Sequence, residues 1–113
     1  MKIDYVKTDE DFKSAIKELQ EITTLWLDFE TTGLDPHSAR ARLLQLCSTE
    51  TEVDERTVYV LDLFKITDTT GLKELIESRE MLVGHNLNFD FRFLYQLGID
   101  FKNKVFDTYI AER

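Results

Sequence analysis

Asp28 and Glu30 are two carboxylates that end an apolar run and stand two positions apart. They close the segment 25–30, and the polar turn that begins at Thr31 follows directly. In an extended strand, residues two apart share a face, with Cα atoms roughly 6.6 Å apart. Two ionised carboxylates at that spacing repel each other unless a cation lies between them, and carboxylate oxygens are preferred ligands of Mg²⁺. The pair therefore predicts a metal site at the end of a strand.

A third carboxylate, Asp90, falls within a helical pattern further along the chain. The helix is expected to end at Gly98, a residue type that commonly closes helices. At about 100° per residue, Asp90 shares a face with three apolar residues, namely Phe93, Leu94 and Leu97. A carboxylate among apolar groups is costly unless a cation or hydrogen-bond donors compensate it. Asp90 is therefore the candidate third ligand of the site at Asp28 and Glu30, which requires the three side chains to converge.

Several other polar and aromatic residues have a structural explanation beside a functional one. His85 could bind a metal or act as a base, but we expect it to hydrogen-bond the backbone. The aromatic series on the Asp90 helix could stack on bases, but it winds around the helix axis, which favours core packing. That series consists of Phe89, Phe91, Phe93 and Tyr95. We expect Asp62 to cap a strand end, and Asp54 and Glu55 to lie in a solvated loop.

Length, composition and charge limit the class of protein. The 113 residues, 42% of them hydrophobic, suffice for one core, so we expect residues 1–113 to form a single domain. No apolar stretch approaches the roughly 20 residues that span a bilayer, and the N-terminus lacks a signal-peptide core. These features predict a cytoplasmic protein with no membrane partner. The single cysteine, Cys47, suits a buried thiol with no catalytic role.

The net charge of -8, from 22 acidic and 14 basic residues, speaks against a broad phosphate-binding surface. It does not exclude an enzyme that acts on nucleic acid. A site that holds a few nucleotides through metal ions and backbone groups needs no basic face, and acidic residues are what bind the metals.

Strand-like and helix-like segments alternate along the chain. The expected strands are 3–6, 25–30, 43–48, 58–63, 81–83 and 105–106. A first helix, capped by Thr8 or Asp9, carries apolar residues at helical spacing, namely Phe12, Ala15, Ile16, Leu19 and Ile22. Thr70 or Thr69 is expected to cap a second helix, which precedes the Asp90 helix.

Three strands in succession, 25–30, 43–48 and 58–63, predict the centre of a sheet. The connection 49–57 is acidic and polar, as in a hairpin loop, so these strands are expected to pair antiparallel. Strand 81–83 follows a helix and would extend the sheet in parallel, which gives an α/β fold with a mixed sheet and flanking helices. Both acidic segments would then lie at the carboxyl ends of strands, where open α/β sheets place their sites.

Two segments resemble the motifs of a known enzyme family. Residues 27–36, LDFETTGLDP, resemble the first exonuclease motif of the DEDD superfamily of 3'-5' exonucleases, and residues 84–90, GHNLNFD, resemble the second. The apolar segments 42–47 and 58–63 and the later 106–108 also fit. Together they most resemble the proofreading exonuclease domain of bacterial DNA polymerase I, with ribonuclease D as a near relative. The resemblance implies an RNase H-like mixed sheet of three antiparallel strands plus parallel strands, with flanking helices.

The resemblance also implies roles for individual residues. Those matching metal ligands are Asp28, Glu30 and Asp90, which would hold two Mg²⁺ or Mn²⁺ ions. One ion would activate a water and the other would stabilise the leaving 3' oxygen. Three further residues match substrate contacts. Leu34 would wedge against the terminal base, the Thr31 backbone would contact the terminal sugar, and Asn86 would lie beside the substrate strand.

One part of the family pattern has no match. The third exonuclease motif, which carries a fourth metal-binding aspartate and a tyrosine or histidine that orients the attacking water, lies downstream of the position that matches Asp107. Asp107 follows a short apolar strand, so we interpret it as a helix cap and core anchor. We therefore expect a domain that is incomplete at its C-terminus, with a weakened metal site and feeble activity. A longer chain with a polymerase domain, or a second polypeptide, would supply the missing motif.

Three function hypotheses follow. The first is a metal-dependent 3'-5' exonuclease of the DNA polymerase I type that acts on single-stranded DNA ends. The second is a ribonuclease D-like exoribonuclease, because contacts to a 2'-hydroxyl depend on geometry that the sequence does not reveal. The third is a catalytically silent exonuclease fold that serves as a docking or structural module. The presence of Asp28, Glu30 and Asp90 argues against the third hypothesis, and the unmatched third motif argues for it.

Overall fold

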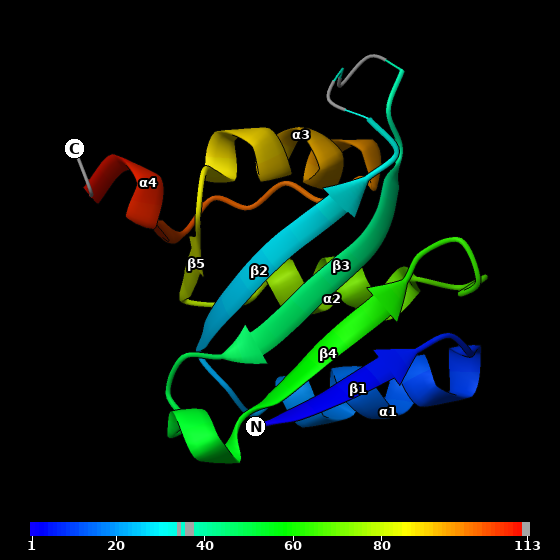
Figure 1. Cartoon of the computed structure of the whole chain (residues 1–113), viewed down its shortest axis with the longest axis vertical. Coiled ribbons are helices and arrows are strands. Elements are labelled where there is room, and N and C mark those ends of the chain that lie inside the picture. The colour runs from blue at the N-terminus through cyan, green and yellow to red at the C-terminus, as the bar shows by residue number, and fades with distance from the viewer. Residues whose placement is uncertain (34, 36–37, 112–113) are drawn as a thin grey trace.

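The computed structural model describes residues 1–33, 35 and 38–111, and it is built on one six-stranded sheet (Figure 1). The strands are β1 (Lys2–Val6), β2 (Thr24–Thr31), β3 (Ala41–Ser48), β4 (Thr57–Asp62), β5 (Met81–Gly84) and β6 (Lys104–Asp107). The helices are α1 (Asp9–Leu19), α2 (Thr70–Glu77), α3 (Leu87–Gln96), α4 (Thr108–Ala111) and the short 3₁₀ helix η1 (Val53–Glu55). Among the residues that the structure describes, none of the helices combines the length and the apolar character needed to span a bilayer.

The strand order is β1-β4-β3-β2-β5-β6. The neighbours β2, β3 and β4 pair antiparallel, whereas β1 pairs parallel to β4, and β5 and β6 add in parallel beyond β2. The prediction of three antiparallel strands extended by parallel strands is confirmed, and the fold is α/β. The sequence did not indicate that β1 would close the other edge, beside β4.

Alternating burial along β2 decides which residues face the helices. Its buried residues are Leu25, Leu27 and Phe29, whereas Asp28 and Glu30 are exposed. Successive side chains of a strand point to opposite faces, so both carboxylates lie on the face away from the core. Antiparallel pairing places Asp28 opposite Gln45 of β3.

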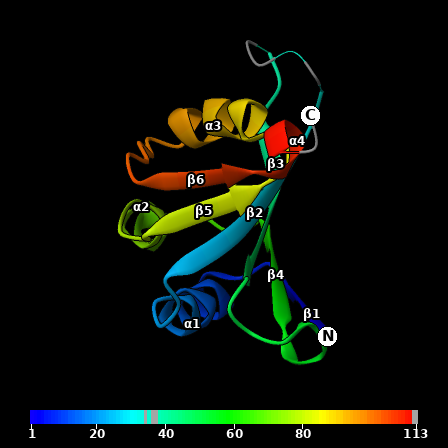
Figure 2. The same cartoon turned by 90° about the vertical axis from the view of Figure 1, so that its left-hand side faces the viewer.

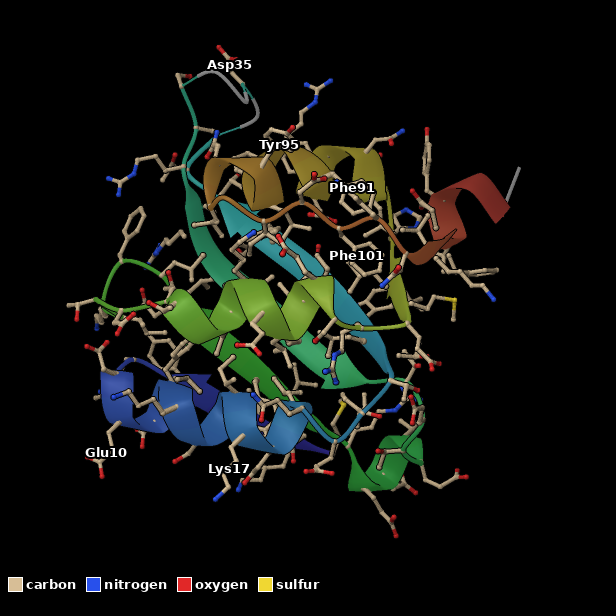
Figure 3. The ribbon with its side chains drawn as sticks, turned by 180° about the vertical axis from the view of Figure 1, so that it is seen from behind. Glu10, Lys17, Asp35, Phe91, Tyr95 and Phe101 are labelled. Atoms are coloured by element: carbon tan, nitrogen blue, oxygen red, sulfur yellow. The ribbon has the colours of Figure 1, made fainter. Side chains whose placement is uncertain are left out.

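The layers are unequal on the two sides of the sheet. Figure 1 looks onto a face that no described helix crosses, with α1 and α2 behind the strands, and Figure 3 shows these two helices covering the rear face. In the edge-on view of Figure 2, α4 lies on the opposite side of the sheet from α1 and α2. We call the uncovered side the open face. Asp28 and Glu30 therefore lie on the open face.

The first helix begins as predicted and ends earlier. The Thr8 hydroxyl oxygen accepts from the Asp11 backbone N–H at 3.1 Å, which identifies Thr8 as the cap. The helix ends at Leu19, so the prediction that Ile22 belongs to it was wrong. The Arg79 guanidinium donates to the carbonyls of Leu19, Gln20 and Ile22. These carbonyls therefore have hydrogen-bond donors without a further helical turn. Ile22 is half-buried against the core.

The second helix packs on the first. A Cβ added to Gly71 would lie 3.5 Å from the Cγ2 methyl of Ile16 in α1. Thr69 is its N-cap residue, so the predicted start of the helix is confirmed, although the Thr69 side chain makes no capping hydrogen bond. Asp68 supplies the cap instead, because its Oδ1 accepts from the Thr70 N–H at 3.0 Å.

The remaining structural expectations are mostly confirmed. Cys47 is buried and free, and Asp62 ends β4 with its Oδ1 accepting from the Phe64 N–H at 3.1 Å. Asp54 and Glu55 are exposed, although they form η1 rather than an irregular loop. Of the aromatic series, Phe93 is fully buried and Phe89 and Phe91 pack partly buried against the core. Tyr95 is 73% exposed and points outward from α3, so core packing was the wrong prediction for it (Figure 3).

Candidate active site

The two acidic segments meet at one edge of the sheet because β2 and β5 run parallel. Trp26 of β2 pairs with Val83 of β5, so the carboxyl ends of both strands point the same way. Glu30 lies near the end of β2, and the chain after Gly84 leaves β5 to form α3. The predicted position of the acidic residues at strand carboxyl ends is confirmed.

Asp28 and Glu30 are neighbours on the open face. Partial burial raises the pKa of Asp28, and the negative charge of Glu30 raises it further, while His85 acts in the opposite direction. The charge of Glu30 thus disfavours ionisation of Asp28, as expected for carboxylates on one face of a strand.

Asp90 reaches the pair from the first turn of α3. Its residue is only 2% exposed, and its Oδ1 accepts a hydrogen bond from the Phe29 backbone N–H at 3.3 Å. Phe29 lies between Asp28 and Glu30 in sequence, so Asp90 contacts the backbone of the strand segment that carries the pair. Burial raises the pKa of Asp90 to about 7; the Phe29 bond opposes this shift, and the charges of Asp28 and Asp107 add to it.

Aromatic packing fixes the helix that carries Asp90. The Phe93 ring lies 5.1 Å from the Phe89 ring and 6.1 Å from the Phe29 ring, measured between centroids. Because Phe29 belongs to β2, this contact ties α3 to the strand of the acidic pair. Core packing therefore sets the distance between Asp90 and that strand.

Asp107 holds the loop that leads into α3. Its Oδ1 accepts from the Asn86 N–H and its Oδ2 from the Leu87 N–H, both at 2.8 Å, and Oδ1 also accepts from the Tyr109 N–H at 3.0 Å. These bonds outweigh the effect of desolvation, which alone would raise the pKa of Asp107, and hold it below its usual value with help from His85. The predicted cap role of Asp107 is confirmed. It serves two helices, because it also receives the first N–H groups of α3.

Asn86 has a left-handed backbone conformation, with φ of 61°, and Gly84 before it is tightly enclosed. A Cβ on Gly84 would lie 2.9 Å from the Leu27 carbonyl oxygen and 2.5 Å from the Leu87 Cδ2. Glycine is therefore required at the end of β5, where the Leu27 carbonyl of β2 and the Leu87 side chain leave no room for a Cβ.

His85 bonds a side chain rather than the backbone, so that expectation was wrong. Its Nδ1 lies 2.9 Å from the Thr108 hydroxyl oxygen, and its ring meets the Tyr109 ring edge-on with centroids 5.4 Å apart. Sequence reasoning gave Thr108 no role at the site, although segment 106–108 was part of the family resemblance. The parallel pairing of β5 with β6 brings residues after Phe106 beside residues after Val83, and the adjacent apolar strands were the signal that could have suggested it.

The three expected substrate-contact residues differ in their exposure and in what the structure describes of them. Asn86 is exposed, and its backbone is held on both sides: its N–H donates to Asp107, and its carbonyl accepts from the Phe89 N–H at 3.1 Å. Thr31 is half-buried at the end of β2, and its hydroxyl donates to the Gly33 carbonyl at 2.6 Å. Leu34 lies outside the described residues.

The donor set fits a divalent cation held by few protein ligands. Across residues 1–33, 35 and 38–111, no three His, Cys, Asp or Glu side chains are arranged so that they could hold a metal ion together. Mg²⁺ usually keeps several waters and is bound by one or two carboxylates together with substrate phosphates. Asp28 and Glu30, exposed on one face beside a buried Asp90, match that second arrangement.

A separate hollow lies at the other end of the parallel strands. Its volume is about 780 Å³, and it is lined by Thr24, Ser78, Glu80, Met81, Lys102, Asn103 and Lys104. None of the candidate carboxylates lines it, so we place the chemistry at the carboxylates and not in this hollow.

Comparison with known proteins defines the class of this domain. The mixed sheet with carboxylates at its strand ends is RNase H-like, and solved structures share it over nearly the whole chain. RNase D of Escherichia coli, an exoribonuclease involved in structured RNA processing, matches 99% of this chain and 28% of its own with a TM-score of 0.79 and 20% identity. Trypanosoma brucei RNase D in complex with RNA U12 matches 94% of this chain and 37% of its own, with a TM-score of 0.77 and 24% identity.

The sequence comparisons identify the family. The profile of the 3'-5' exonuclease family matches residues 3–113, so this chain belongs to the 3'-5' exonucleases. DNA polymerase I of Aquifex aeolicus is 44% identical over 111 residues, which cover 98% of this chain. The chain spans 17% of the length of that relative.

Proposed function

We propose that this chain is a metal-dependent exonuclease domain that removes nucleotides from the 3' end of single-stranded DNA, as a proofreading domain does. The hydrogen bond from the Phe29 N–H to Asp90 carries the proposal. It sets a buried carboxylate from α3 beside the exposed pair on β2, in a chain of the 3'-5' exonuclease family.

Asp28, Glu30 and Asp90 are the proposed catalytic residues and ligands of two Mg²⁺ or Mn²⁺ ions. When bound, the ions would activate water and stabilise charge on the oxygens of the phosphodiester. Asp28 and Glu30 present oxygens on the open face, where a polynucleotide has access. Burial raises the pKa of Asp90 to about 7. A bound cation would compensate the cost of burying its charge, so Asp90 would then be the ionised third ligand.

Thr31, Leu34 and Asn86 are the proposed substrate contacts. Asn86 is supported by its place between the loop bonds of Asp107 and the start of α3, which holds it at the edge of the site. Thr31 directly follows Glu30, so its backbone lies within one residue of the proposed metal.

Two nucleic acids, single-stranded DNA and RNA, are candidate substrates. The 44% identity to a DNA polymerase I favours single-stranded DNA. The similarity in fold to RNase D structures favours an exoribonuclease as the second candidate. We place the first ahead, because its sequence similarity is greater. By the same comparison, we propose that the domain works within a longer polymerase polypeptide.

Manganese titration tests the metal site. Mn²⁺ broadens nuclear resonances near its binding site, so we expect selective loss of signals from Asp28, Glu30 and Asp90, together with a rise in Tm. Asp28→Asn should abolish both responses. Glu10→Gln, which changes an exposed carboxylate on the far side of the molecule, is the matched control and should respond as wild type (Figure 3). No selective broadening at millimolar Mn²⁺ would rule out the metal site.

Labelled oligonucleotides test the reaction. We expect single-nucleotide release from the 3' end of single-stranded DNA, with slower release from RNA of the same sequence. The same assay on Asp28→Asn excludes contamination. Metal binding without cleavage of either polymer would favour the silent docking module over the exonuclease.

A further inference from the structure

His85 stands beside Asp28 on the open face. The pairing of the parallel strands β2 and β5 ends at Trp26 and Val83, and continuing this register by two residues places His85, the first residue after β5, level with Asp28. Neighbouring strands lie about 4.8 Å apart, and residues two apart share a face. The exposed imidazole is therefore a lateral neighbour of the proposed metal-binding carboxylate. Its electrostatic effect on the pKa of both Asp28 and Asp107 agrees with this position.

Thr108 determines which nitrogen of the His85 ring carries the proton. The Thr108 hydroxyl has one hydrogen, and it donates to the Gly84 carbonyl oxygen at 3.3 Å. At its 2.9 Å contact with His85 Nδ1, the hydroxyl oxygen must then accept, so Nδ1 is the donor. In the neutral ring, Nε2 therefore has a free lone pair.

The surroundings hold this ring in place. Asp107 binds the N–H groups of Asn86 and Leu87, which follow His85 directly, and the Tyr109 ring meets the imidazole edge-on. Asp107 at the end of β6 and Tyr109 in α4 thus hold the loop after β5. A ring that is exposed and yet held on two sides is suited to contact a ligand without losing much side-chain entropy.

We propose that His85 contacts the terminal nucleotide, its Nε2 accepting a hydrogen bond from a sugar hydroxyl, with Thr108 as the positioning residue. This inference rests on the proposed function. A lone pair selects for hydrogen-bond donors, and the backbone at a 3' end offers donors only in its sugar hydroxyls, because phosphate oxygens accept. DNA provides the 3'-hydroxyl, and RNA adds the 2'-hydroxyl.

Two matched variants separate the ring nitrogens. In His85→Gln the terminal amide reaches toward the Nε2 position and retains an acceptor there, whereas His85→Asn retains only a polar atom near Nδ1. Binding is measured by fluorescence anisotropy in Ca²⁺ at about pH 8, where imidazoles are generally neutral. The ligands are single-stranded DNA with a 3'-hydroxyl, the same DNA with a dideoxy end, and RNA of that sequence.

We expect wild type to bind the hydroxyl-bearing end about three- to tenfold more tightly than the dideoxy end, which is the usual effect of one hydrogen bond. His85→Asn should abolish this preference and His85→Gln should retain most of it. A preference for RNA over DNA that disappears in His85→Asn would identify the 2'-hydroxyl as the donor. The proposal is wrong if His85→Asn binds all ends as wild type does, or weakens all of them equally.

The role of Thr108 has its own readout. Nitrogen-15 shifts of the His85 ring report which nitrogen is protonated, and Thr108→Val, which removes the hydroxyl at nearly constant volume, should mix the two tautomers and reduce the hydroxyl preference. An unchanged ring spectrum would exclude the positioning role. The rise in Tm caused by Mn²⁺ should persist in His85→Asn. Failure of the metal site would therefore be distinct from failure of the His85 contact.

Discussion

The carboxylate of Asp90 and the backbone N–H of Phe29 form a hydrogen bond of 3.3 Å across 61 residues of sequence. The donor comes from the residue between the two carboxylates of β2, so backbone geometry rather than a salt bridge places Asp90 beside them. An N–H donor stabilises the ionised carboxylate only in part, because burial still raises the pKa of Asp90 to about 7. Without a cation, the arrangement therefore costs folding free energy at neutral pH.

Replacing Asp90 by Asn should stabilise the metal-free chain at neutral pH. The folded state binds the Asp90 proton more tightly than the unfolded state, whose carboxyl titrates near 3.8. Stability therefore falls as the pH rises from about 4 to about 7, and Asp90→Asn should lack this loss. We expect a gain of about 1 to 2 kcal/mol at pH 8, less than the full shift implies because water screens part of the charge. Urea unfolding at several pH values measures it.

The two proteins should approach equal stability at about pH 2 to 3, below the unfolded value of 3.8, because Asp90 is then protonated in both states. A constant difference between them at all pH values would show that ionisation of Asp90 is not the cause. Added Mn²⁺ should reverse the order at neutral pH, because only wild type retains the third carboxylate.

The sequence predicted the strands well because their apolar residues either alternate with polar ones or form a continuous run. The predicted segments 25–30, 43–48 and 58–63 each lie within two residues of the observed bounds of β2, β3 and β4. The expectation that Asp90 lies against the strand of the acidic pair was also right, whereas its role as a third metal ligand stays a prediction. That expectation followed from one charged residue on an apolar helix face together with parallel strands whose carboxyl ends share an edge.

The failures share one physical reason, which is that partners distant in sequence decided them. Helical periodicity predicted that Ile22 belongs to α1. The helix ends at Leu19 instead, because the Arg79 guanidinium donates hydrogen bonds to three carbonyls at and after its end. His85 was expected to bond the backbone, yet its partner Thr108 comes 23 residues later and meets it only because β6 pairs with β5. No local pattern reports such contacts.

Removing the Asp107 carboxylate should loosen the site loop. Asp107→Ala leaves the N–H groups of Asn86 and Leu87 without their partner, so we expect Tm to fall by several degrees and amide exchange of both residues to accelerate. Asp107→Asn, which retains one acceptor oxygen, should have a smaller effect. Unchanged exchange at Asn86 in Asp107→Ala would contradict the assigned role.

Gly84→Ala and Gly71→Ala should change the free energy of unfolding in opposite directions. Gly84→Ala forces its Cβ against the Leu27 carbonyl oxygen, and we expect a loss of about 1 to 3 kcal/mol. Gly71→Ala meets Ile16 at an ordinary 3.5 Å within α2, and we expect a gain of about 0.4 to 1 kcal/mol from reduced freedom of the unfolded chain. Urea midpoints of the two variants provide the comparison. Equal effects would mean that the approach of β5 to β2 is not tight.

Arg79 should be among the most important surface residues for stability. Its Nε donates to the Leu75 carbonyl at 2.9 Å and its Nη1 to the Leu19 and Gln20 carbonyls at 3.2 and 3.0 Å. Arg79→Ala leaves these oxygens without a charged donor, so we expect a loss of about 2 to 3 kcal/mol. Arg79→Lys should restore less than half of it, because one ammonium cannot replace the guanidinium fork. Arg92→Ala, an exposed change on α3, should stay within about 0.5 kcal/mol, and a similar loss there would point to net charge instead.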